Sequence, residues 1–278
     1  MSSINTRKSD IVWNYIGTIV SMASGFVLLP LLMHFLSSSE LGLWYVYVAL
    51  SNFAMLFEFG FNPTFARNIV YVISGAQHLS IEGCDIKSVQ EGIDWHLLNT
   101  VIKASKVIYA ILAVVVLALL STIGSLYISF VASGMGSFDI WVSWGLFCAS
   151  VFLNLYFLWS ITVLRGYGDI AGENKAVVIG RAAQLSVSAI LLLLGYGLVG
   201  AAIGYLANAI LLRLSAVVML RKHKEIEKGR HSDTMPVEAS SIREIFLTIF
   251  HVAWRDGLVQ LLSLIHISEP TRQEASRM

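Results

Sequence analysis

Hydrophobic residues fall in seven long stretches that alternate with polar connections. A helix that crosses the hydrocarbon core of a bilayer needs about 20 mainly apolar residues, and each stretch reaches that length. The pattern predicts spans at 10–36, 41–74, 101–131, 138–164, 175–195, 198–220 and 243–262. The predicted fold is therefore all-α and integral to a membrane.

The second stretch is longer than one crossing requires and contains Asn62 followed by Pro63. Proline inside a helix lacks an N–H donor and clashes with the preceding turn. We therefore expect a kink in the second span near these residues. The aromatic residues Trp13, Trp44, Tyr45 and Tyr47 are of the type found in interfacial belts, which is where we expect them.

Lysine and arginine gather on one side of the predicted zigzag. They precede the first span or flank the connections after the second, fourth and sixth: Arg7, Lys8, Arg67, Lys87, Lys103, Lys106, Arg165, Lys175, Arg181, Arg221, Lys222, Lys224, Lys228, Arg230 and Arg243. The connections at 37–40, 131–140 and 195–200 contain neither residue type. Because cytoplasmic loops carry the excess of cations, this distribution predicts a cytoplasmic N-terminus.

Composition agrees with a membrane protein. Hydrophobic residues make up 56% of the chain and charged residues only 13%, against about 25% charged in a soluble domain. The net charge of +1 gives no reason to expect a nucleic-acid partner. Cys84 lies in a polar connection and Cys148 in an apolar span, so we expect free thiols. The first span is too long for a cleaved signal segment and is expected to be retained.

Four arginines lie within the predicted spans, in the half nearer the cation-rich connections: Arg67, Arg181, Arg213 and Arg255. Charged side chains at membrane depth are costly and are functional candidates. Guanidinium groups bind phosphate with two parallel hydrogen bonds. The four residues therefore predict a cationic cavity that suits a lipid-linked phosphate or pyrophosphate. Two alternatives stay open: each arginine extends to the headgroups, or Arg255 forms an ion pair with Asp256 or Glu58.

Uncharged polar residues form stripes on the predicted helices. Arg181, Gln184 and Ser188 recur at helical spacing on the fifth span, and Asn154 belongs to a similar stripe on the fourth. Asn14 lies in the first span and Asn62 in the second. Such stripes face protein or water, and they either line a cavity or hold helices together.

No arrangement of residues typical of catalysis occurs. His34 and His251 are isolated from each other and from cysteine, and no nucleophile elbow or phosphate-binding loop is present. We expect no enzymatic activity, no metal and no cofactor.

The run from Leu262 to Arg272, LSLIHISEPTR, resembles the translation of a transposase sequencing adapter. It interrupts the seventh span with Glu269 and Pro270, where apolar residues would continue. We therefore expect 262–278 to be foreign to the protein, and the natural chain to continue beyond an N-terminal fragment.

Two segments resemble a known family. The segments are Phe35–Trp44, FLSSSELGLW, and Phe57–Ile69, FEFGFNPTFARNI. They are similar to the first two helices of the O-antigen and polysaccharide flippases, in the multidrug/oligosaccharidyl-lipid/polysaccharide exporter superfamily. Glu58, Gly60 and Arg67 occupy the acidic, glycine and arginine positions of that pattern.

The resemblance implies two lobes with twelve or more helices in total. Residues 1–242 would form the N-terminal lobe, and 243–261 would begin the second. The implied activity is translocation of undecaprenyl-pyrophosphate-linked oligosaccharide by alternating access across a bacterial inner membrane, in polysaccharide or O-antigen biosynthesis. Partners would be this lipid, membrane lipids and other polysaccharide-assembly proteins.

Residue roles follow from combining the resemblance with the charges at membrane depth. Arg67, Arg181, Arg213 and Arg255 would bind the pyrophosphate, while Glu58 and Asp256 would form ion pairs or carry a coupling proton. The polar residues Asn14, Asn62, Asn154, Gln184 and Ser188 would line the cavity.

Three other functions remain open. A drug or cation exporter of the same superfamily predicts a cavity dominated by carboxylates, whereas arginine outnumbers acid at depth here. A membrane-embedded polysaccharide enzyme needs a large polar loop on the outer side, where the connections are short. The third alternative is a scaffold that transports nothing.

Overall fold

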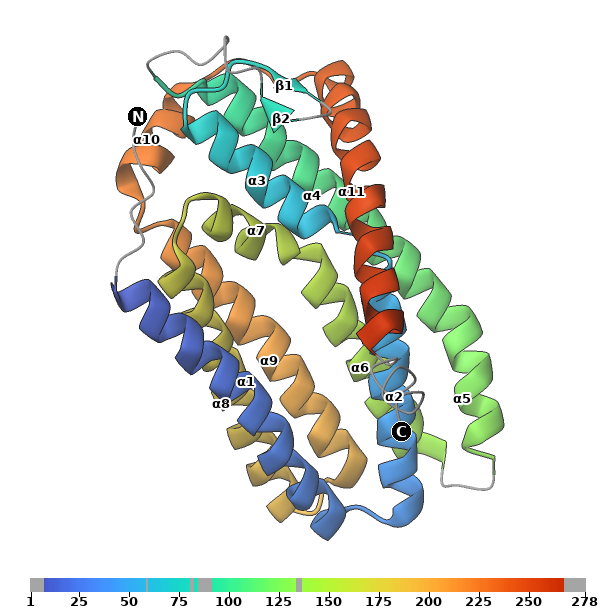
Figure 1. Cartoon of the computed structure of the whole chain (residues 1–278). Helices are drawn as coiled ribbons and strands as arrows, with labels where there is room; N and C mark the ends of the chain where they lie inside the picture. Colours follow the sequence, from blue (N-terminus) through green and yellow to red (C-terminus); the bar gives the residue numbers. More distant parts are fainter. Residues whose placement is uncertain (1–7, 59, 81–82, 85–91, 134–136, 268–278) are drawn as a thin grey trace, which may run out of the picture.

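The computed structural model describes residues 8–58, 60–80, 83–84, 92–133 and 137–267, and helices dominate this part of the chain (Figure 1). The elements are α1 (Lys8–Phe35), α2 (Ser38–Leu56), α3 (Phe61–Ile73), β1 (Leu79–Ser80), β2 (Gly83–Cys84), α4 (Trp95–Leu119), the π-helical turn Leu120–Gly124, α5 (Ser125–Val131), α6 (Ser137–Tyr156), α7 (Leu158–Gly166), α8 (Ile170–Leu193), α9 (Gly197–Leu220), α10 (Lys224–Ser232) and α11 (Ala239–Ile267). The strands β1 and β2 pair antiparallel in a small hairpin, with Leu79 opposite Cys84.

Five helical segments of the described chain are long and apolar enough to cross a membrane: Lys8–Phe35, Trp95–Val131, Phe138–Gly166, Ile170–Leu193 and Gly197–Leu220. The pair α2 and α3 qualifies as a sixth span that is bent by 43°. The all-α membrane fold is therefore confirmed. The seventh predicted span lies within α11, which is not among these segments.

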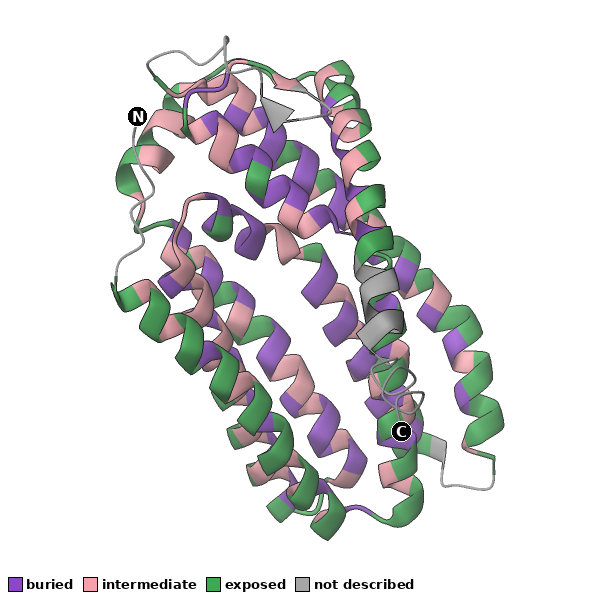
Figure 2. Ribbon diagram, viewed as in Figure 1, coloured by how far each residue is buried: buried purple, intermediate pink, exposed green. Residues whose placement is uncertain are grey.

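The helices run back and forth between two ends (Figure 1). One end is called the cation-rich end. There α3, α7 and α9 finish, and α4, α8 and α11 begin. The opposite, cation-poor end is where α1, α5 and α8 finish and α2, α6 and α9 begin. In Figure 1, α1, α8 and α9 pack side by side, α9 also contacts α6, and α11 packs against α3 and α4. Apolar residues exposed along α1, such as Phe26, give that helix a lipid-facing surface (Figure 2).

The predicted kink in the second span occurs at the junction of α2 and α3. Gly60 has a φ of 78°, a conformation that glycine adopts without steric cost. Pro63 falls in the first turn of α3, where backbone N–H groups have no partner within the helix. The chain therefore bends just before Asn62 and Pro63, and proline begins the new helix instead of distorting an old one.

Two of the expected interfacial aromatic residues lie in the core instead. Trp44 is 4% exposed and Tyr47 is fully buried. The Tyr47 hydroxyl is 3.0 Å from the Ile140 carbonyl oxygen, to which it donates a hydrogen bond. The interfacial prediction was wrong for these two because the start of α2 is covered by α6 and α9, so their rings pack against Trp144, Phe147 and Tyr205.

Small residues bring α8 and α9 close together. The buried face of α8 repeats every four residues: Gly172, Ala176, Gly180, Gln184, Ser188 and Leu192. A Cβ atom at Gly204 on α9 would lie 1.9 Å from the Ser188 Oγ atom, and one at Gly180 would lie 2.5 Å from the Asn208 Oδ1 atom. Glycine is therefore required at both positions for this approach, as in other tightly packed membrane helices.

Candidate substrate-binding residues

Arg67 on α3 forms an ion pair with Asp256 on α11. The Arg67 Nη2 atom lies 2.9 Å from the Asp256 Oδ2 atom, and the Thr64 hydroxyl donates to the same oxygen at 3.4 Å. Both charged side chains remain partly exposed, at 44% and 36%. Of the four candidate arginines, Arg67 is thus the one whose charge is neutralised by a carboxylate.

The same two helices touch through their backbones at Gly60. A Cβ atom there would lie 3.1 Å from the Gly257 nitrogen and 3.2 Å from the Ala253 carbonyl oxygen. The start of α3 and the middle of α11 are therefore joined by a close glycine contact beside the ion pair.

A chain of polar contacts runs inward from Glu58. Its carboxylate accepts a hydrogen bond from the backbone N–H of Asn62 and so caps the first turn of α3. The Asn62 side-chain oxygen accepts a hydrogen bond from the Thr162 hydroxyl at 2.9 Å, and the Tyr109 hydroxyl lies 3.4 Å from that of Thr162. Three elements, the α2–α3 bend, α4 and α7, thus meet at a buried polar site.

Arg165 contributes a cation next to this polar chain. It forms an ion pair with Glu173 across the α7–α8 connection, with Nε 3.1 Å from one carboxylate oxygen. Its charge also interacts electrostatically with Glu58 and Tyr109. Sequence reasoning treated Arg165 only as a loop cation and missed Tyr109 and Thr162. The available signal was the three-residue spacing that places Thr162 and Arg165 on one helical face.

Arg213 is the buried member of the four candidate arginines. It is 7% exposed, and its Nη2 atom donates to the backbone oxygen of Asn154 at 2.8 Å and to the side-chain oxygen at 3.3 Å. Its Nε and Nη1 atoms are buried without a hydrogen-bond partner. It borders a cavity of about 190 Å³ between α6 and α9. Buried donors normally find partners, so the Arg213 Nε and Nη1 atoms are unsatisfied in this structure.

Arg181 belongs to a polar contact between α8 and α9. Its Nη1 atom donates to the Gln184 side-chain oxygen at 3.1 Å, and the Asn208 side-chain nitrogen donates to the same oxygen at 3.3 Å. Ser188 is fully buried on the same face. Gln184 and Ser188 are thus buried within the protein, while their predicted role as cavity-lining residues stays a prediction.

The remaining predicted residues lie apart from these contacts. Arg255 is exposed on α11 and has no partner among the residues that the structure describes. Asn14 on α1 is also exposed, with its side-chain oxygen 3.5 Å from the Asn174 side-chain nitrogen on α8. Within the described ranges, no hydrogen bond or ion pair gives two of the four arginines a common partner. A shared pyrophosphate site remains a prediction.

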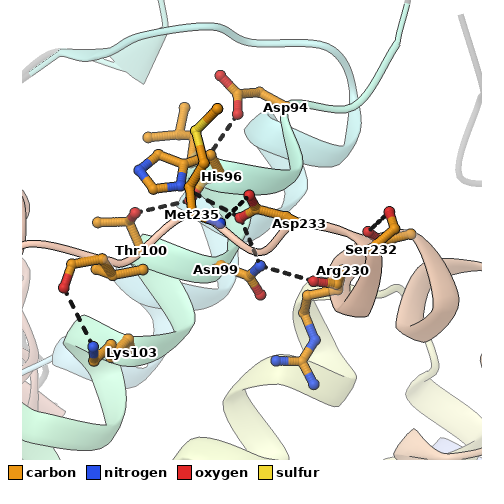
Figure 3. Close-up of polar contacts among 12 residues, drawn as sticks. Asp94, His96, Asn99, Thr100, Lys103, Arg230, Ser232, Asp233 and Met235 are labelled. Carbon is orange, nitrogen blue, oxygen red and sulfur yellow. Dashed lines mark hydrogen bonds and ion pairs between the residues drawn. The ribbon is translucent and has the colours of Figure 1, made fainter.

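A second polar cluster fastens the α10–α11 connection to α4 at the cation-rich end (Figure 3). The Asp233 carboxylate lies 3.0 Å from the Asn99 side-chain nitrogen, 3.3 Å from the His96 Nδ1 atom and 3.1 Å from the Met235 backbone nitrogen. The hydrogen bond from Asn99 is the largest cause that lowers the pKa of Asp233, and those from the Met235 N–H and from His96 add to it. Lys103 donates to the Val237 carbonyl oxygen at 3.3 Å. The described residues contain no cluster of histidine, cysteine and acidic side chains that could hold a metal.

Comparison with known proteins gives one informative result. No protein-family model matches the chain, and no curated protein matches it. A solved structure described as the outward-facing conformation of a multidrug resistance MATE family transporter of the MOP superfamily is similar, with a TM-score of 0.61 and 20% identity. The match covers 91% of this chain and 52% of that one, so the chain spans about half the length of that transporter.

A likeness at this identity is evidence about the fold. Membership of the exporter superfamily, and of the O-antigen flippases within it, stays a prediction from the two sequence segments. The chain is therefore similar in fold to about half of that transporter.

Proposed function

We propose that this chain is the first lobe of a membrane exporter that translocates a lipid-linked oligosaccharide with a pyrophosphate group. The fold supports an exporter. The cation-rich end would face the cytoplasm of a bacterial cell, because cytoplasmic loops carry the excess of lysine and arginine. Substrate would enter from the inner leaflet and leave to the outer leaflet by alternating access, in a pathway of polysaccharide assembly.

The observation that carries this proposal is the imbalance of available charge at membrane depth. The Glu58 carboxylate caps α3, and the Asp256 carboxylate is paired with Arg67. Arg213 keeps two buried donors without partners. Because these two acids are engaged while Arg213 keeps two donors without partners, an anionic substrate fits the lobe better than a cationic one.

Arg181 and Arg213 are the residues that we expect to meet the pyrophosphate first. Both lie on the α8–α9 pair, where Gln184 and Asn154 hold them in place through hydrogen bonds to their guanidinium groups. Arg255 would join them from α11 when the second lobe approaches. Arg67 would bind phosphate only after release from Asp256.

A drug or cation exporter is the second candidate, because the similar solved structure is described as a multidrug resistance transporter. In that case Glu58 and Asp256 would be the residues that bind substrate or a coupling proton. No particular contact favours a membrane-embedded enzyme or a scaffold.

The two candidates are separated by transport measurements on the full-length protein in membrane vesicles. We expect R181A and R255A to reduce translocation of lipid-linked oligosaccharide at least tenfold, since each removes a charge-assisted phosphate contact. K224A, on the exposed surface of α10, is the matched control. Full translocation by both arginine variants would contradict the proposal that these arginines bind the pyrophosphate. Efflux of a cationic dye that fails in E58Q and D256N but survives in R181A would favour the drug exporter.

A further inference from the structure

A separate cavity lies at the cation-rich end, and none of the four candidate arginines lines it. Its volume is about 220 Å³, and α4, α7, α9 and α10 surround it. Apolar side chains from the spans, Ile102, Val163 and Val217, form part of the lining. Charged side chains from the α9–α10 connection and from α10, including Arg221 and Arg230, form another part. The cavity is therefore amphipathic and lies where a membrane-spanning bundle meets its polar connections.

The acid that lines this cavity is already engaged. One oxygen of Glu227 accepts a hydrogen bond from the Tyr167 hydroxyl at 3.0 Å, and the other lies 2.7 Å from the Arg230 Nη2 atom. The Arg230 Nε atom is buried and has no partner. Arg221 is exposed, and its side chain makes no hydrogen bond or ion pair with another described residue. Donors thus exceed acceptors around the cavity.

A third cation stands beside the same space. The Lys106 Nζ atom lies 4.2 Å from the ring centroid of Trp159, which also lines the cavity. Its charge interacts with Arg230 and Glu227. Figure 3 shows that the Arg230 carbonyl faces Asn99 while its guanidinium extends away from that cluster. Lys106, Arg221 and Arg230 are therefore balanced by a single carboxylate.

We propose that this cavity binds the phosphate of a lipid headgroup between Arg221 and Arg230, with Lys106 close by. The unpartnered Arg230 Nε atom and the exposed Arg221 guanidinium group can both bind an anion, and basic pockets between helices at the cytoplasmic side suit anionic lipid headgroups. The apolar lining from the spans favours a lipid over a soluble anion. Two sources share this chemistry: a resident anionic phospholipid, and the phosphate-bearing lipid that the exporter would carry.

Lipid binding to the full chain in detergent tests the site, with native mass spectrometry as the readout. The probes are phosphatidylglycerol and zwitterionic phosphatidylcholine. Each cation near such a surface contributes about 1 kcal/mol, so K106Q/R221Q is expected to weaken phosphatidylglycerol binding roughly 10- to 30-fold. The matched control is K222Q/K224Q, which removes two cations at the same end but outside the cavity lining, and it should bind as the unmodified protein does.

Equal weakening in both double variants would overturn the proposal, because the binding would then reflect general surface charge. R221E serves as a second variant, since Arg221 is exposed and no hydrogen bond or ion pair of its side chain within the described residues would be lost. It should lose phosphatidylglycerol more completely than K222E. Retention by R221E would also overturn the proposal.

Competition identifies the source of the phosphate. Undecaprenyl pyrophosphate that displaces phosphatidylglycerol from the unmodified chain would assign the site to the transported lipid class. Failure to displace it would assign the site to a resident phospholipid, and displacement by inorganic phosphate alone would overturn a lipid site. These binding measurements do not depend on transport, so they stand whether or not the translocation proposal fails.

Discussion

At the residue scale, Arg213 is buried, and two of its guanidinium nitrogen atoms have no hydrogen-bond partner. A buried cation that lacks partners destabilises the fold that contains it, and replacing it with an apolar side chain is often neutral or stabilising. We therefore expect R213M to leave the thermal midpoint in detergent unchanged or raised, while translocation of lipid-linked oligosaccharide falls at least tenfold. Differential scanning of the purified protein and the vesicle assay give the two readouts. A large drop in the midpoint would instead assign Arg213 a structural role through Asn154.

Asp169 gives a prediction about pH. Its carboxylate caps α8 by accepting from the Gly172 N–H at 2.7 Å, and it also lies 3.0 Å from the His223 Nε2 atom. The hydrogen bond with His223 is the largest cause that lowers the pKa of Asp169 from its ordinary 3.8. Because the folded-state pKa is lowered, the stabilisation is complete above pH 3.8 and is lost as pH falls through the lowered pKa.

The measurement is thermal unfolding of the unmodified protein, D169A and D169N across that range. D169A should cost about 0.5–2 kcal/mol at neutral pH, which is typical of a lost N-cap, and its deficit should shrink in acid. Asparagine is an equally good cap, so D169N isolates the charge interaction with His223. A deficit of D169A that is independent of pH would contradict the ionic part of this account.

Sequence reasoning found the charged residues at membrane depth but not their partners. Arg67 and Asp256 were both singled out, yet their ion pair joins residues 189 positions apart, and no local pattern encodes such a contact. Tyr109 and Thr162 were missed because a buried hydroxyl in an apolar helix looks like ordinary core until its partner is known. Asn154 and Gln184 were found because amides are rare and conspicuous in apolar spans.

At the element scale, the close packing of α8 against α9 depends on glycine at position 204. A Cβ atom at Gly204 would lie 1.9 Å from the Ser188 Oγ atom and 3.0 Å from the Gln184 carbonyl oxygen. We expect G204A to destabilise the protein by about 1–3 kcal/mol, the usual cost of overpacking. The measurement is unfolding in mixed detergent micelles.

Gly25 on α1 is the matched control, because a Cβ atom there meets nothing within 4 Å. G25A should be neutral or slightly stabilising, since alanine favours helix. Combining G204A with S188A should recover part of the loss by removing the nearest atom. If G204A and G25A behave alike, the close approach of α8 and α9 is not needed for stability.

The elements themselves were largely predictable. Long apolar stretches indicated the spans, and proline indicated a break in the second. The break falls at Gly60, which has a positive φ and lies against α11. A sequence pattern indicates the region where a helix is interrupted, but tertiary contacts determine the residue at which the break occurs.

At the scale of the whole molecule, α11 is attached to the first lobe through α3 and α4. We expect the Arg67–Asp256 pair to show a coupling energy of at most about 1 kcal/mol in a double-mutant cycle, because both side chains are more than a third exposed. R67A, D256A and the double variant would be compared by unfolding. Additive effects would mean that the glycine contact alone joins the helices.

The similar transporter is about twice as long as the matched region, which leads to a prediction about the gene. We expect a long sequencing read across codon 262 to continue in frame into five or more further spans. A stop codon directly after Met278 would contradict this, and a seven-helix protein would then have to dimerise to form two lobes. The described helix α11 ends at Ile267, and 268–278 lie outside the described residues.

The Arg67–Asp256 pair also bears on how the protein enters the membrane during synthesis. Arg67 is synthesised long before Asp256. The second span therefore reaches the insertion machinery without the carboxylate that pairs with Arg67 in the folded protein. Segment α11, with Arg255 and Asp256 side by side, is equally unsuited to integrate alone. Each segment therefore gains its charged partner only after the other has been synthesised. A nascent chain released before Asp256 would leave Arg67 without the carboxylate that pairs with it in the folded protein.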